Sequence, residues 1–130
     1  MILFGHPLIP SEQFYHISSI DAILKTPSNS IIALLFEEQN IDIITHLRDN
    51  KIRFALYISS ELEAVLGENL GATYLIVTTK NGSEIQRIAE HYLFDAKILG
   101  YCEEMDDLET LIEMRLDGAI FGDALVKITT

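Results

Sequence analysis

The stretch IRFALYISSELEAVLGENLGATYLIVT (residues 52–78) holds the pattern that decides the fold. Its two apolar runs, 52–58 and 72–78, have the composition of buried β-strands. The segment between them has helical apolar spacing, begins at Ser59 or Ser60 with acidic residues in its first turn, and reaches Gly71, a residue typical of a helix stop. A strand–helix–strand unit of this kind predicts two parallel strands joined by a helical crossover.

The same alternation recurs about every 20 residues along the chain. Helices are expected over roughly 40–50, 84–94 and 103–114, with a short one before Pro27 and a capping box formed by Ser83 and Gln86. The remaining apolar runs of strand type are FYHIS (14–18), SIIALLF (30–36), AKILGYC (96–102) and GAIFG (118–122). The sequence therefore predicts an α/β protein with a mostly parallel, six-stranded, doubly wound sheet, and a ligand site at the carboxyl ends of the strands.

Residues 1–12 stand apart from this pattern. Pro7 and Pro10 restrict the backbone there, which predicts an edge strand or an extended N-terminal arm. The apolar side chains of the arm need a cover, either from this domain or from a neighbouring subunit. Residues 13–130 are interpreted as one domain.

Composition excludes several classes of function. The formal net charge is −11, and Lys and Arg form no cluster, so a nucleic-acid or anionic-membrane surface is not expected. The apolar runs are too short to span a bilayer, which predicts no direct membrane insertion. The start has no secretory pattern, and the single cysteine, Cys102, fits a reducing compartment. We therefore expect a cytoplasmic protein.

We assign no catalytic residue from the sequence. The histidines lack metal-site spacing, and His16 within a strand is interpreted as structural. Cys102 precedes Glu103 and Glu104, whose charges should raise the pKa of its thiol, so it is interpreted as a packing residue. The acidic segment 103–107 is interpreted mainly as a solvated helix start.

Two features bear on a ligand. The first expected turn, ISSIDA (17–22), lacks the glycines that let a backbone approach a pyrophosphate, which argues against ordinary NAD binding. Glu37 and Glu38 follow the second strand, where doubly wound folds often carry the acid that holds a ribose. The candidate cofactors are a nucleotide or a divalent cation, and no metal ligand is assigned.

From about Ser30 to Val126 the order of these units resembles the nucleotide-binding half of the regulator-of-potassium-conductance family, known as RCK or TrkA-N. SIIALLFEE resembles its second strand with a terminal acid, and ELEAVLGENLGATYLIVTT resembles its short helix leading to an Ala-Asp-x-x-Ile-x-x-Thr strand. DDLETLIEMRLDGAIFGDAL is similar to its last unit. Ser59 and Ser60 stand where the family has Gly-Asp, and the glycine fingerprint is absent.

The resemblance implies a Rossmann-like fold and a non-enzymatic, cytoplasmic regulatory domain that senses a ligand. It further implies a homodimer or higher oligomer that couples to a membrane potassium channel or transporter subunit. The ligand-binding residues it implies are Glu37 or Glu38 for a ribose, together with Thr78 and Thr79 after the fourth strand. We add Ser59, which ends the third strand at the same edge.

Three alternatives stay open. The first is a small α/β enzyme or phosphate-ligand-binding domain with its site at the carboxyl ends of the strands. The second is a degenerate domain whose only role is dimerisation. The third is architectural, because the last units also look like the end of a phosphate-binding (β/α)₈ barrel, although six units cannot close eight strands within one chain.

Overall fold

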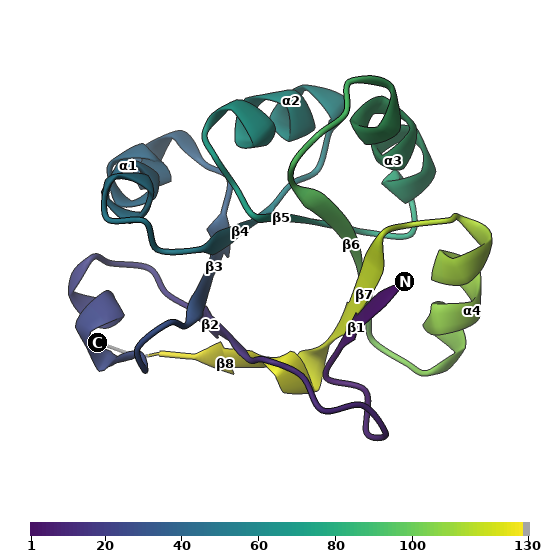
Figure 1. Ribbon diagram of the computed structural model, residues 1–130, viewed down its shortest axis with the longest axis horizontal. Coiled ribbons are helices and arrows are strands. Elements are labelled where there is room, and N and C mark those ends of the chain that lie inside the picture. The colour runs from purple at the N-terminus through teal and green to yellow at the C-terminus, as the bar shows by residue number, and fades with distance from the viewer. Residues whose placement is uncertain (129–130) are drawn as a thin grey trace.

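A computed structural model of the chain describes residues 1–128 and consists of one parallel sheet covered by helices (Figure 1). The helices are α1 (Ile41–Asp49), α2 (Glu61–Asn69), α3 (Gly82–His91) and α4 (Asp106–Glu113), with short 3₁₀ turns η1 (Asp21–Lys25), η2 (Glu38–Asn40) and η3 (Gly122–Ala124). The strands are β1 (Ile2–Phe4), β2 (Phe14–His16), β3 (Ile31–Leu35), β4 (Phe54–Tyr57), β5 (Tyr74–Val77), β6 (Lys97–Cys102), β7 (Gly118–Phe121) and β8 (Leu125–Lys127).

Every strand pairing in this sheet is parallel, as the strand–helix rhythm predicts. The strand order is β1-β7-β6-β5-β4-β3-β2-β8, so from β2 to β7 neighbours in the sheet are also neighbours in the chain. The N-terminal segment pairs with the C-terminal one twice, because β1 lies beside β7 and β2 lies beside β8. The sheet therefore curls into a barrel-like shape (Figure 1).

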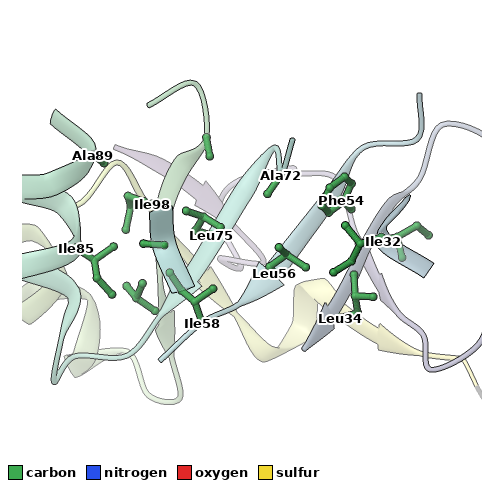
Figure 2. Packing of buried hydrophobic residues seen from close by; sticks show 14 of the residues in the cluster. Ile32, Leu34, Phe54, Leu56, Ile58, Ala72, Leu75, Ile85, Ala89 and Ile98 are labelled. Atoms are coloured by element: carbon green, nitrogen blue, oxygen red, sulfur yellow. The ribbon is translucent and has the colours of Figure 1, made fainter. Parts of the chain in front are cut away.

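All four α-helices lie outside this curl (Figure 1). Right-handed crossovers place helices on one face as long as the strand order advances in one direction, and only a reversal moves them to the other face. The outer face of the sheet packs against the helices through one apolar cluster, which Figure 2 shows with Ile85 of α3 near Ile98 of β6. A second cluster, drawn from the strands and η3 alone, fills the inside of the curl.

The structure corrects the expected sheet in two respects. It has eight strands, not six, because Ile2–Phe4 and Leu125–Lys127 add short strands at the two ends of the chain. Helices cover one face only, whereas the doubly wound arrangement has helices on both. Three-residue strands carry too little pattern to be seen locally, and they exist here because each finds a partner far away in the sequence.

Three aromatic rings pack together in the inner core, from the carboxyl end of β1 and the amino ends of β2 and β5. Phe4 and Phe14 meet edge to face with ring centroids 4.9 Å apart, and Tyr74 lies 5.5 Å from Phe4 and 5.4 Å from Phe14. Next to the start of β4, the exposed Arg53 guanidinium donates two hydrogen bonds to the exposed Glu12 carboxylate, at 2.6 and 3.2 Å. The three rings belong to the barrel interior, whereas this ion pair lies at the surface.

Local boundaries largely follow the sequence. The Ser60 hydroxyl accepts the Glu63 N–H at the start of α2, and Gly71, with φ of +94°, follows its end, so both expectations are confirmed. The expected capping box at Ser83 is wrong, because α3 begins at Gly82 with Asn81 as its N-cap. Gln86 is instead buried, and its side chain accepts the Asp117 N–H and donates to the Asp117 carboxylate.

None of the helices within residues 1–128 combines the length and the apolar composition that crossing a bilayer requires.

The inner aromatic cluster predicts a specific loss of stability. Phe14 is fully buried, so Phe14→Ala should lower the free energy of unfolding by about 3–5 kcal/mol, measured by urea titration followed by circular dichroism. Tyr92→Ala is the matched control, since this ring is 67% exposed and its loss should change stability by about 0.5 kcal/mol or less. Equal effects of the two changes would contradict the assignment of Phe14 to the core.

Candidate functional site

The carboxyl ends of the strands surround an open cup of about 500 Å³. This volume lies within the range of about 300–1,000 Å³ that is typical of small-molecule sites. We call this hollow the cup. Its lining includes the side chains of His16, Tyr57, Thr78, Tyr101, Leu125 and Lys127. They come from β2, β4, β6 and β8 and from the residue after β5. The cup therefore depends on the whole curled sheet, not on one motif.

Strand alternation explains why these residues meet. Side chains two apart on a strand share a face, so Ala55 and Tyr57 point to the same side of β4, as Leu99 and Tyr101 do on β6. Ala55 and Leu99 belong to the inner core, which places the two tyrosines on the inner face, one step nearer the carboxyl edge. Ile76 pairs in register with both Tyr57 and Leu99, and it lines the cup beneath the rings.

Tyr57 and His16 form an aromatic wall. Their ring centroids lie 5.7 Å apart, with the planes inclined at 50°. Burial, aided by the neighbouring Tyr101, raises the pKa of Tyr57 to about 12, so its phenol stays protonated and able to donate a hydrogen bond.

His16 is neutral under ordinary conditions. Burial lowers the pKa of its imidazole, and the positive charge of Lys127 lowers it further. His16 pairs in register with Lys127, so the two side chains lie side by side at the mouth of the cup. The neutral imidazole offers one donor and one acceptor nitrogen.

Of the predicted ligand residues, Thr78 lines the cup. Its hydroxyl donates to the Asn81 side-chain oxygen at 3.4 Å and accepts the Lys80 N–H at 3.3 Å. Asn81 also donates to the Ser59 carbonyl at 2.9 Å, which ties the ends of β4 and β5 together. The Ser59 hydroxyl itself donates to Glu63, as part of the cap of α2.

Glu37 lies in a smaller hollow that shares His16 and Leu35 with the cup. Its carboxylate accepts a hydrogen bond from the Gln39 side chain at 2.6 Å. Glu38 is exposed at the start of η2, and Thr79 is exposed beside Thr78. The structure thus brings Thr78 to the cup and Glu37 next to it, and it places Glu38 and Thr79 outside both hollows.

A further small hollow on the other flank contains Cys102, Glu103 and Asp123. Burial raises the pKa of the Cys102 thiol to about 11, with a contribution from Asp107. The expected direction of this shift is confirmed, but its causes are burial and Asp107, not Glu103 and Glu104. Asp107 accepts the N–H groups of Glu103 and Glu104, each at 3.1 Å, and so caps the turn into α4.

A hollow of similar size, about 470 Å³, lies at the opposite ends of the strands. It is lined by Ile32 and by the loops around residues 23–30 and 50–53, and Ile32 belongs to the outer core. Arg53, on its rim, is already paired with Glu12. We therefore place the candidate site in the cup, where side chains from five different strand ends converge.

Within residues 1–128, no group of three or more His, Cys, Asp or Glu side chains is arranged to hold a metal ion.

Sequence reasoning missed His16, Tyr57, Tyr101 and Lys127. A usable signal was present, because Tyr57 and Tyr101 each stand near the carboxyl end of an apolar run, two residues after an apolar inward-facing position. The position of Lys127 beside His16 has no local signal, since it depends on the pairing of the two ends of the chain.

No protein-family model and no curated protein matches the chain.

The electrostatics at His16 can be measured directly. Since Lys127 lowers the pKa of His16, Lys127→Met should raise that pKa toward the ordinary histidine value of about 6.5, as followed by NMR titration of the imidazole carbons. Burial still acts in the variant, so the pKa should stay below that value. His16→Gln assigns the resonance, and an unchanged pKa in Lys127→Met would contradict the proximity of the two groups.

The same shift has a consequence for stability. Because the folded-state pKa lies below the unfolded one, the unfolded chain binds more protons as the pH falls, so the contribution of His16 is full above about pH 6.5 and is lost as the pH falls toward the folded pKa. His16→Gln should therefore flatten the dependence of urea midpoints on pH below about 6.5.

Proposed function

We propose that this protein is a ligand-sensing domain that holds a small, mostly apolar molecule in the cup. The observation that carries the proposal is the cup itself, a hollow of about 500 Å³ at the carboxyl ends of the strands, with aromatic walls and few polar tips. Ligand sites in parallel α/β proteins commonly lie at this edge, because the loops there can vary without disturbing the sheet.

The side chains of the cup are suited to binding a ligand. His16 and Tyr57 are both held neutral, which suits them to stacking and to hydrogen bonding with a ligand. Sensing without turnover agrees with the regulatory role that the RCK resemblance implies. In that reading the domain is cytoplasmic, forms a homodimer or higher oligomer, and couples to a potassium channel or transporter subunit.

The proposal is tested by blocking the cup. Indole, 2-naphthol and 2-naphthoate serve as probes, and amide NMR shifts with thermal unfolding report binding. At least one probe should raise the unfolding temperature and shift the amides of Tyr57, Thr78 and Tyr101. Thr78→Trp, which fills the cup, should weaken that binding by about tenfold or more, equivalent to about 1.4 kcal/mol.

Thr79→Trp is the matched control, because Thr79 is exposed next door and does not line the cup. The Thr79→Trp variant should bind the probe with the same affinity as the unmodified protein. Shifts confined to the hollow around residues 23–32, or the same loss in both tryptophan variants, would overturn the cup as the site. Consumption of a bound probe would favour the alternative of a small enzyme.

A separate titration tests whether the protein binds a nucleotide through Glu37 or Glu38. NAD⁺, NADH, ATP and ADP are titrated against the protein and against the Glu37→Ala, Glu38→Ala double variant, with mass followed by light scattering. If either acid holds a ribose, the double variant should bind the nucleotide at least about tenfold more weakly. Equal affinity in the two proteins would remove Glu37 and Glu38 from the site.

A further inference from the structure

We propose that the ligand of the cup is an aromatic monoanion, whose flat body lies against Tyr57, Tyr101 and His16 and whose anionic group lies against Lys127. This inference rests on the proposed function and narrows it to one class of ligand, an aromatic carboxylate or sulfonate.

The walls of the cup select for a flat body. Tyr57 and Tyr101 stand on the inner face of alternate strands, β4 and β6, with the face of β5 between them. The His16 ring continues the wall at 5.7 Å from Tyr57. Aromatic rings attract one another in offset or edge-to-face arrangements beyond what buried area alone provides, so a planar aromatic ligand suits this wall better than an aliphatic one.

The charge of the cup is opposite to that of the protein. The chain carries 20 acidic and 9 basic residues, yet the described side chains that line the cup include Lys127 and no Asp or Glu. The ion pairs found within residues 1–128, Arg48–Asp49 and Arg53–Glu12, do not involve Lys127. A ligand anion at the mouth therefore meets a local positive charge inside an otherwise acidic surface.

The polar groups of Tyr57 and His16, which line the cup together with Lys127, can also donate hydrogen bonds to an anion. The Tyr57 phenol keeps its proton well above neutral pH and so can donate to a carboxylate oxygen. The neutral His16 imidazole can donate from one nitrogen. Protonated donors beside an ammonium group form the charge-assisted hydrogen bonds that hold carboxylates and sulfonates.

A single lysine favours a monoanion over a phosphate. Phosphate sites use several backbone N–H groups, usually in a glycine-rich loop at the start of a full helix. The turn after β7, η3, has only three residues, and no glycine-rich loop follows β2. The cup thus supplies one full positive charge together with side-chain donors.

The decisive experiment compares ligands that differ only in charge. Two matched pairs, 2-naphthoate with 2-naphthamide and indole-3-acetate with indole-3-acetamide, are titrated into the full chain by calorimetry and by amide NMR. We expect each acid to bind about tenfold more tightly than its amide, because an ion pair and charge-assisted hydrogen bonds exist only for the acid.

Two lysine variants locate the effect. Lys127→Met keeps most of the apolar stem and removes the charge, so it should reduce the preference for the acid to about twofold or less. Lys97→Met is the matched control, since Lys97 is an exposed lysine at the amino end of β6. It should leave the preference unchanged, which separates local contact from the loss of one charge overall.

A third variant tests the aromatic wall. Tyr101→Leu should weaken the binding of the acid and of the amide in each pair by the same factor, because it removes stacking on the ring and leaves the charge of Lys127 in place. Circular dichroism and the amide spectrum check that each variant is folded.

The outcomes separate this inference from the proposed function. Equal binding of acid and amide in the cup overturns the anion and leaves the cup as a ligand site. A preference for the acid that survives in Lys127→Met overturns the role of Lys127. Binding of neither member of either pair, while indole or 2-naphthol still binds, overturns the aromatic acid as the ligand and leaves the cup as a site. Failure of the acids, the amides, indole and 2-naphthol together overturns the cup as a site for aromatic ligands.

Discussion

The constraint on which this structure depends is that the strand order never reverses between β2 and β7. Right-handed crossovers then leave every helix on the same face of the sheet. The opposite face carries buried apolar residues from every central strand, such as Ile31, Ile76 and Ile120, and it has no helix to cover it. A twisted parallel sheet can bury such a face by curling onto itself, and this sheet does so (Figure 1).

The ends of the chain complete the curl. β1 and β2 belong to the N-terminal segment, and β7 and β8 belong to the C-terminal segment. β1 pairs in parallel with β7, and β2 pairs in parallel with β8. At Gly118 the fit is close, because a Cβ there would lie 2.6 Å from the Ile2 carbonyl oxygen. The arm that looks separate in the sequence is therefore part of the sheet at residues 2–4.

The packing of side chains inside the barrel determines where a hollow remains. The rings of Phe4, Phe14 and Tyr74 pack together in the inner core, in the same cluster as the small side chains of Ala33 and Ala55. The carboxyl half holds Tyr57 and Tyr101 near its rim, and the space between them stays open as the cup. The same curl that buries the inner face thus also brings side chains from β2, β4, β6 and β8 together at the cup.

The sequence by itself determined the α/β class, the parallel direction of the strands, and the helix ends at Ser60 and Gly71. These features depend on local periodicity and turn chemistry, which neighbouring residues encode. Only the tertiary structure decided the strand number, the placement of all helices outside the curl, and the meeting of His16 with Lys127. The strand number and the meeting of His16 with Lys127 depend on pairing between residues more than 100 positions apart, and short strands such as Leu125–Lys127 gain their identity from a distant partner and not from their own composition. The placement of the helices depends on the order of the strands in the sheet, which no single strand–helix unit encodes. The sequence analysis placed Thr78 at this edge but missed Tyr57 and Tyr101, although both stand near the carboxyl end of an apolar run.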